Sequence, residues 1–181
     1  TTITLSDGRL AEATNTGMVL DGQRFTTESG LLSNQVNHIV EDEQGILYIA
    51  TDKGLNRYAA GQMDKFPTPY PLTSLYVDSG RGVYAMSEKG GFLLSNNQLE
   101  VLRGLNQEPM GPLFADAEGR LQAFGSSALY RRITPTRFVL VFASCRFVFF
   151  ITPIRLVLVF ASCRFVFFIT PTRFVSKNES T

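Results

Sequence analysis

The sequence of 181 residues predicts an all-β fold assembled from about four copies of one unit. Short apolar segments alternate with glycine-containing turns, as expected for strands, and similar units recur with a period of about 37 residues. No unit shows the 3.6-residue apolar stripe of a helix or the leucine spacing of a horseshoe repeat. A four-stranded unit with two apolar faces has to stack on its neighbours, so the sequence predicts a partial β-propeller of about four blades.

Glycines and aspartates at the same turns of successive units set the period. Gly8 and Gly45 are 37 residues apart, and Gly119 follows after twice that distance. The third unit is one residue shorter, because Asp42 recurs 36 residues later as Asp78. Glycine adopts the positive φ angles of tight turns at little cost, and Asp side chains bond to the main chain two residues on. We therefore expect the acids to cap turns; a calcium loop or acid–base catalysis is the alternative.

The first two units cover residues 1–28 and 33–66. Unit one begins so close to the N-terminus that its first strand is expected to be missing, which favours a fragment of a longer chain. Its Asp21-Gly22 pair predicts a type I′ hairpin turn. Unit two is the most regular, and its expected strands are Val36–Val40, Ile46–Thr51, Leu55–Ala59 and Met63–Phe66. The second of these lacks alternation, so both of its faces should be buried.

Units three and four cover residues 70–102 and 108–132. Three prolines, Pro67, Pro69 and Pro71, predict an extended connector before unit three, because proline cannot donate within a central strand. The expected strands of unit three are Leu75–Val77, Val83–Met86, Phe92–Leu94 and Leu99–Leu102. In unit four they are Leu113–Ala115, Leu121–Phe124 and Ala128–Arg131.

The composition changes abruptly after unit four. Residues 1–132 carry 11 Lys and Arg against 15 Asp and Glu, whereas residues 133–181 carry 6 against 1. The acidic body offers no basic stripe for nucleic acid. The tail holds 10 of the 15 phenylalanines, and ITPTRFVLVFASCRFVFF (133–150) is followed by ITPIRLVLVFASCRFVFF (151–168) and a third ITPTRFV. The sequence therefore divides into a propeller part, residues 1–132, and a tandem-repeat tail, residues 133–181.

Three interpretations of this tail remain open. Arginine recurs at every ninth residue, so no continuous apolar face survives in a helix or strand unless turns at Thr134-Pro135, Ser144 and Thr152-Pro153 reset the register. Spanning a bilayer takes roughly 20 apolar residues, and the uninterrupted stretches here are far shorter, so no convincing membrane span is present. Short strands packed on the last blade are a second possibility. The leading hypothesis is a translated DNA repeat that is not a native domain.

Few residues are suited to catalysis or metal binding. His38 is the single histidine, which excludes a two-histidine site, and its place in an apolar strand predicts a packed residue. Cys145 and Cys163 occupy equivalent places in the two tail copies, so duplication explains them. No phosphate-binding loop, nucleophile elbow or zinc spacing is present. The sequence predicts no catalytic residue, no metal site and no cofactor.

Polar residues beside strand ends are the better candidates for ligand recognition, because propellers gather ligand contacts at loop tips. Ordinary solvated loop residues are the alternative interpretation. The candidates are Asn34, Asn37, Asn56, Arg57 and Arg81.

The segment LLSNQVNHIVEDEQGILYIATDKGLNRY resembles the two-component regulator propeller repeat. The matching residues are Asn34, Val36, Glu41, Asp42, Gly45, Tyr48, Thr51, Gly54, Leu55 and Arg57. The match is strong over unit two and partial over the other units, about Thr1–Arg132. It departs from the family at Tyr48 and Tyr84, where the family usually has tryptophan and this chain has none.

The resemblance implies a periplasmic sensor module of a hybrid histidine kinase or diguanylate cyclase. Such a module binds a small-molecule ligand, in many members a carbohydrate, and passes the signal through a membrane segment to a cytoplasmic output domain. We therefore expect ligand sensing without catalysis, with the missing blades and the output domain of the parent protein as partners. A protein-interaction scaffold of the WD type is the main alternative. A propeller lyase or hydrolase would need convergent carboxylates or a base from two blades.

Overall fold

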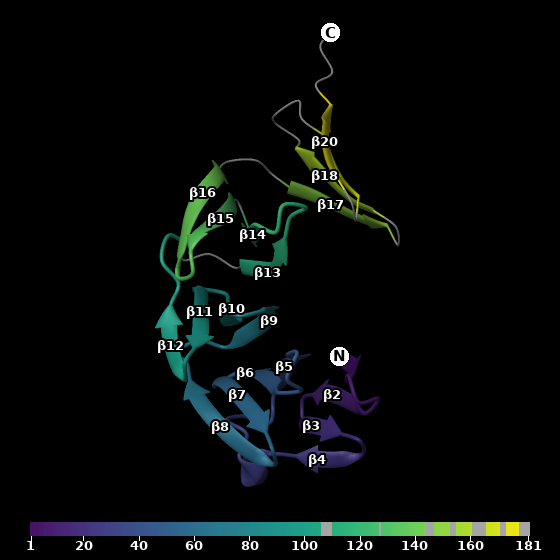
Figure 1. Cartoon of the computed structure of the whole chain (residues 1–181), viewed down its shortest axis with the longest axis vertical. Coiled ribbons are helices and arrows are strands. Elements are labelled where there is room, and N and C mark those ends of the chain that lie inside the picture. The colour runs from purple at the N-terminus through teal and green to yellow at the C-terminus, as the bar shows by residue number, and fades with distance from the viewer. Residues whose placement is uncertain are drawn as a thin grey trace.

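The computed structural model of the chain describes residues 1–105, 110–126 and 128–143, with side chains as far as Val141, and the main chain of four later strands. Figure 1 shows four-stranded sheets that follow one another along an arc. Within each sheet consecutive strands pair antiparallel. The described residues contain one turn of 3-10 helix, η1 (Thr27–Ser29), and otherwise only strands and turns. The all-β prediction is confirmed.

The first two sheets correspond to the first two sequence units. The first contains β1 (Thr2–Thr4), β2 (Leu10–Thr14), β3 (Gly17–Leu20) and β4 (Gln23–Phe25). The second contains β5 (Val36–Glu41), β6 (Leu47–Thr51), β7 (Gly54–Ala59) and β8 (Gln62–Pro67). Unit one therefore has all four strands, and the expectation that its first strand is missing is wrong; β1 is short but pairs fully with β2.

The third and fourth sheets follow the same order. The third contains β9 (Leu72–Asp78), β10 (Gly82–Ser87), β11 (Gly90–Ser95) and β12 (Gln98–Val101). The fourth contains β13 (Met110–Ala115), β14 (Leu121–Gly125), β15 (Ala128–Thr134) and β16 (Arg137–Ala143). Its last strand lies wholly beyond residue 132, so the fourth sheet crosses the boundary that composition marked. The sharp change in charge and aromatic content misplaced that boundary, because β16 belongs to the tail by sequence and to the fourth sheet by pairing.

Two kinds of turn explain the recurring glycines and aspartates. Asp21 and Gly22 have φ angles of 48° and 80°, the left-handed pair that a type I′ hairpin requires. Gly54 has a φ of 137°, and a Cβ there would lie 2.4 Å from the carbonyl oxygen of Phe66. Only glycine fits that position. Beside it, the Thr51 hydroxyl donates a 2.8 Å hydrogen bond to the Gly54 carbonyl, which closes the turn between β6 and β7.

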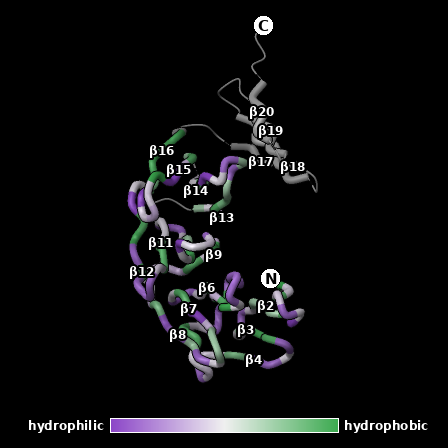
Figure 2. Tube along the Cα trace, in the orientation of Figure 1, coloured by the Kyte–Doolittle hydropathy of each residue, from purple (hydrophilic) through white to green (hydrophobic). Residues whose placement is uncertain are grey.

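The first strands of successive sheets lie against one another. β5 contacts β2 and β9, and β13 contacts β9 and β10. In Figure 1 the last strands β8, β12 and β16 lie on the convex side of the arc. Figure 2 shows hydrophobic residues concentrated on strands such as β16 and hydrophilic residues at the connections. The first strands of the sheets therefore lie together on one side, and the sheets spread apart towards their last strands, as wedge-shaped sheets do around a common axis.

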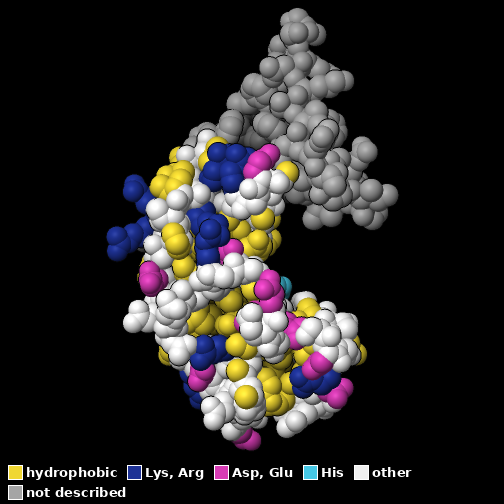
Figure 3. Space-filling model, viewed as in Figure 1, with side chains coloured by type: hydrophobic (Ala, Val, Ile, Leu, Met, Phe, Trp, Pro, Cys, Tyr) yellow, Lys and Arg dark blue, Asp and Glu magenta, His cyan; other side chains and the backbone are white. Residues whose placement is uncertain are grey.

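Charge is not spread evenly along the arc. Figure 3 shows basic side chains gathered over the fourth sheet and acidic side chains mainly over the first two. The basic residues in or beside the fourth sheet are Arg103, Arg120, Arg131, Arg132 and Arg137. The change from an acidic to a basic composition along the sequence therefore begins within the four sheets, before the tail.

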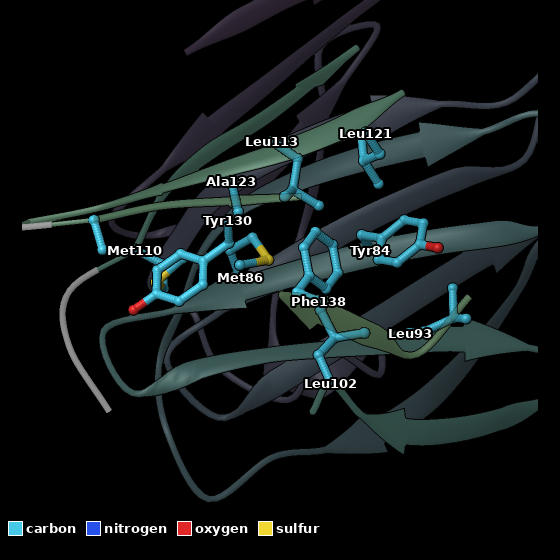
Figure 4. Packing of buried hydrophobic residues seen from close by; sticks show 11 residues of the cluster. Tyr84, Met86, Leu93, Leu102, Met110, Leu113, Leu121, Ala123, Tyr130 and Phe138 are labelled. Carbon is cyan, nitrogen blue, oxygen red and sulfur yellow. The ribbon is translucent and has the colours of Figure 1, made fainter. Parts of the chain in front are cut away.

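Apolar side chains bury themselves between neighbouring sheets. One cluster joins the third and fourth sheets, and Figure 4 shows Tyr84, Met86 and Leu93 meeting Tyr130 and Phe138 there. Two further clusters join the first to the second sheet and the second to the third. The position held by Ala11, Tyr48 and Tyr84 faces the following sheet in each case. Each interface is thus built from equivalent positions of the repeat.

The main chain of the tail forms a fifth antiparallel sheet. Its strands are β17 (Phe147–Thr152), β18 (Arg155–Phe160), β19 (Val166–Thr170) and β20 (Arg173–Lys177). The repeated Thr and Arg of the tail pair across the same hairpin three times, as Thr134 with Arg137, Thr152 with Arg155 and Thr170 with Arg173. The turn expected at Thr134-Pro135 is found, and the first copy adds β16 to the fourth sheet. The turns expected at Ser144 and Pro153 fall outside the described residues. No helix within the described residues has the length and apolar character to cross a membrane. Cys145 and Cys163 lie outside the described residues.

Candidate functional site

A cleft of about 420 Å³ opens between the second and third sheets. The second sheet contributes the turn after β5 together with Tyr48 and Arg57. The third sheet contributes the turn after β9, which includes Asp78 and Arg81, and the turn between β11 and β12, which includes Asn97. The cleft therefore collects charged and amide side chains from two repeats at one end of their strands.

The turn after β5 is held by the carboxylate of Asp42. Its Oδ1 accepts hydrogen bonds of 2.9 Å from the main-chain N–H groups of Gln44 and Ile46. Its Oδ2 accepts a 3.0 Å bond from the Tyr48 hydroxyl. Burial raises the pKa of Tyr48 to about 12, and the hydrogen bond to Asp42 adds to the rise. Tyr48 is thus a neutral hydrogen-bonding group at all physiological pH values, and Asp42 acts as the turn cap predicted from the sequence.

The opposite wall carries the most accessible cation of the cleft. The Arg81 side chain is 54% exposed and has an ion pair of 3.5 Å with Asp78, which is at the long end for such pairs. The other oxygen of Asp78 accepts a hydrogen bond from Arg132 of β15. The Arg81 guanidinium therefore keeps donors directed to solvent at the mouth of the cleft.

Two contacts join the sheets across the cleft. The Ser79 hydroxyl donates a 2.6 Å hydrogen bond to Glu43. Arg57 of β7 donates to Asn97 in the third sheet and also to Asp64 of its own sheet. These contacts are made by side chains on turns and sheet edges, so they fix the relative position of the two sheets without filling the space between them.

The cleft is open because the side chain at one repeat position is shorter than its equivalent in the next sheet. Leu93 pairs with Tyr84, and Arg131 pairs with Gln122, so Leu94 and Arg132 stand at equivalent places in the third strands of their sheets. Leu94 lines the cleft between the second and third sheets. At the next interface the longer Arg132 enters the equivalent space and donates to Tyr84 and Asp78. The difference between these two residues opens one interface and closes the other.

Of the five residues predicted to recognise a ligand, two line the cleft and three do not. Arg57 and Arg81 both line the cleft. Asn56 is fully buried, accepts from the N–H of Leu32 and donates to the carbonyls of Gly30 and Asp64, so it holds a connection within the sheet.

The two remaining candidates lie at the opposite end of β5 from the cleft. Asn34 accepts from the N–H of Thr27. Asn37 donates to Asp52 and to the carbonyl of Leu72, which ties β5 to β9. Propensity alone could not separate these groups, because Asn is frequent in both turns and binding sites. Tyr48, Asn97 and Leu94 were not among the candidates; comparing Leu94 with Arg132 along the repeat was the signal that could have found the cleft.

His38 and the turn aspartates are hydrogen-bonded to the main chain in the described part. The Nδ1 atom of His38 accepts a 3.2 Å hydrogen bond from the N–H of Leu75, and burial lowers the pKa of the imidazole. His38 is thus a packed residue between β5 and β9, as predicted. Asp116 caps its turn through the N–H groups of Glu118 and Arg120. Among the residues that the structure describes, no three His, Cys, Asp or Glu side chains are grouped to hold a metal ion.

Comparison with known protein families identifies the repeat. Residues 30–53 match the family described as two component regulator propeller. The chain contains a two-component regulator propeller repeat. The match covers seven of the ten residues on which the sequence resemblance rested, and Gly54, Leu55 and Arg57 lie just beyond it. A search of curated proteins by sequence gave no match.

Solved structures show the fold to be part of a β-propeller. The extracellular domain of BT4673 from B. thetaiotaomicron, described as a hybrid two component system, is similar with a TM-score of 0.66 and 17% identity over 98% of this chain. The corresponding domain of BT3049 from the same organism gives 0.62 and 13% over 95%. Virginiamycin B lyase from Staphylococcus aureus gives 0.66 and 9% over 99% of this chain and 69% of the lyase. The chain spans 27% of the length of each of the two extracellular domains.

Proposed function

We propose that this chain is part of the ligand-sensing propeller of an extracellular or periplasmic receptor and that it binds a small polar ligand, such as a glycan fragment, without catalysis. The cleft between the second and third sheets is the observation that carries this proposal. The regulator propeller repeat at residues 30–53 supports a role in signal transduction. Likeness to the extracellular domains of two-component systems supports the location.

The chemistry of the cleft suits a ligand rich in hydroxyl groups. A hydroxyl both donates and accepts hydrogen bonds. The cleft offers donors on Arg57 and Arg81 and acceptors on Asp42, Glu43 and Asp78. Arg81 is the residue with most capacity left for a ligand, because its ion pair is long and its side chain is half exposed.

Binding without catalysis is favoured because the groups that could act as acid or base, His38 and Tyr48, already make hydrogen bonds within the protein. His38 accepts a main-chain hydrogen bond and has a lowered pKa. Tyr48 has a raised pKa and donates to Asp42. A ligand that bridges the two walls would bind one relative position of the sheets more tightly than another. A sensor needs this difference in affinity, because it shifts the equilibrium between the two conformations.

A binding experiment tests the proposal. Isothermal titration of the whole chain with short oligosaccharides, neutral and uronate-containing, should show saturable binding to one class of them. Arg81→Ala should weaken that binding at least ~10-fold, equivalent to about 1.4 kcal/mol. Arg9→Ala is the matched control, because Arg9 pairs with Asp7 in a turn of the first sheet and its side chain is similarly exposed. Equal effects of the two substitutions, or no binding of any member, would contradict the proposal.

A further inference from the structure

The outer strand of the fourth sheet, β16, is held mainly through main-chain atoms. The N–H of Arg103 donates a 2.7 Å hydrogen bond to the carbonyl of Thr136, and the N–H of Phe138 donates a 2.8 Å bond to the carbonyl of Arg103. The Tyr84 hydroxyl donates a 2.8 Å bond to the carbonyl of Pro135. β16 therefore lies in a slot between β15 and the loop at Arg103, a surface that recognises an extended main chain.

One side chain of β16 is anchored in this slot. Phe138 is 1% exposed and packs edge-to-face on Tyr84 with ring centroids 6.4 Å apart (Figure 4). Leu140 and Val141 remain 49% and 37% exposed. Gly104 allows the close approach, because a Cβ there would lie 1.9 Å from the Phe138 carbonyl oxygen. The slot thus selects an apolar residue at one position and tolerates others along the strand.

The chain carries a second segment that meets these requirements. Residues 151–168 repeat residues 133–150 except for Ile154 in place of Thr136 and Leu156 in place of Phe138. The bond from Arg103 goes to the carbonyl of Thr136, which Ile154 also has. Leu156 is apolar and can enter the pocket of Phe138 at the cost of the ring contact. The hairpin before the strand is also shared, because Thr152 pairs with Arg155 as Thr134 pairs with Arg137.

We propose that the slot between β15 and the Arg103 loop is a strand-acceptor site whose alternative ligand is the second tail copy of the same chain. In this second state Arg155–Phe160 replaces Arg137–Ala143 as the outer strand, and 18 residues are looped out after Arg132. The outer strand of the first copy and its counterpart in the second differ only at Phe138 and Leu156, so both present the same pattern to the slot.

The first copy is the preferred occupant for three reasons. Arg155–Phe160 already pairs with β17 and β19 in the fifth sheet, and these pairings would have to break. Closing a loop of 18 residues disfavours the second state by about 10²-fold. Loss of the Phe138 ring contact disfavours it further. The second state is therefore a minor state of the parent chain and becomes dominant only when the first copy is impaired.

Substitutions at the two equivalent anchor positions test the proposal in the full chain. Phe138→Asp should lower the thermal unfolding midpoint, while Leu156→Asp alone should leave it unchanged, because that residue is not in the slot. The double variant should unfold at least ~5 °C below Phe138→Asp, since no apolar anchor is left for the slot. Phe138→Asp with Leu156→Phe should recover about 2–4 °C relative to Phe138→Asp alone.

A control and two contrary results complete the test. Leu140→Asp places an acid at an exposed position of β16 and should change the midpoint little. If Phe138→Asp fails to fold, Phe138→Ala with and without Leu156→Phe gives the same comparison. Equal midpoints for the single and double aspartate variants, together with no rescue by Leu156→Phe, would overturn the proposal. Elution of Phe138→Asp as a dimer would also overturn it, because the second copy would then come from another molecule.

Discussion

The interface between the second and third sheets and that between the third and fourth have a tyrosine at the same repeat position, and beside it an arginine that bonds across the interface. At the first interface the arginine is Arg57, which comes from the earlier sheet and turns outwards to Asp64 and Asn97. At the second it is Arg132, which comes from the later sheet and turns inwards to Asp78 and Tyr84. The same tyrosine position thus lies beside an open, polar cleft at one interface and beside a closed ion pair at the next.

The difference shows that the residues that stack the sheets are not the residues that shape the space between them. Apolar positions stack every pair of sheets, whereas one residue on the third strand decides whether the space beside the turn is filled. Five predictions, in order of decreasing effect, break or sharpen this contrast.

Opening the closed interface should have the largest effect. Arg132→Leu gives the fourth sheet the residue that the third has at Leu94, and it leaves the largely buried Asp78 without this partner. Removing one member of a buried ion pair is strongly destabilising, so we expect a loss of about 3 kcal/mol in the free energy of unfolding. Chemical denaturation measures it. Arg9→Ala, which breaks an exposed pair, should cost less than ~1 kcal/mol; similar losses would show that the closed interface is not special.

The caps of the two turns should differ in strength. The side chain of Asp116 is fully buried and accepts from Arg120 and Gln122 as well as from two N–H groups, whereas Asp42 accepts from Tyr48 and two N–H groups. Asp116→Ala should therefore cost about 2 kcal/mol and Asp42→Ala about 1 kcal/mol in the free energy of unfolding. Urea denaturation of both variants measures the difference, and a larger loss at Asp42 would contradict it.

The Asp116 cap should also make stability depend on pH. Burial alone raises the pKa of Asp116, but hydrogen bonds from Arg120 and Gln122 outweigh it and hold the pKa below its ordinary value. A carboxyl group with a lowered folded pKa stabilises the protein above its unfolded pKa, about 3.9. That contribution is lost as the pH falls through the folded pKa. The parent chain should lose more stability below about pH 4 than Asp116→Ala does.

Closing the open interface should weaken ligand binding. Leu94→Arg places an arginine where the fourth sheet has Arg132, facing Asp42 and Tyr48. We expect at least a ~10-fold loss of affinity for any oligosaccharide that binds the parent, about 1.4 kcal/mol. Isothermal titration measures it, and Leu94→Met is the control that keeps an apolar side chain. Undiminished binding by Leu94→Arg would place the ligand elsewhere.

The smallest effect is expected at the tyrosine of the open interface. Tyr48→Phe removes one hydrogen bond to Asp42 and should cost about 1 kcal/mol. Because the pKa of Tyr48 is raised to about 12, Tyr48→Phe should remove one late step from the absorbance titration of the parent, in which burial also raises the pKa values of Tyr76 and Tyr84. Loss of an early step instead would contradict the assigned environment.

Much of the fold could be predicted from the sequence. The Asp42 and Asp116 caps and the Asp21-Gly22 turn lie where the repeat placed them, because such turns depend on local hydrogen bonds and φ angles. Two expectations failed. Unit one keeps its first strand, Thr2–Thr4, which pairs with β2 although it begins at the second residue. The boundary after residue 132 failed for a non-local reason, because β16 joins the fourth sheet through Arg103 and Tyr84, which lie far away in sequence.

By itself the sequence determined the period, the turns and the apolar faces, because each follows from the conformational preferences of residues within one unit. Only the tertiary structure decided which side chains meet between units. Arg57 and Arg81 both line the cleft, while the buried Asn56 makes its hydrogen bonds to the main chain of Gly30, Leu32 and Asp64. A contact across an interface depends on how far each side chain reaches from its neighbouring sheet, and no single unit contains that information.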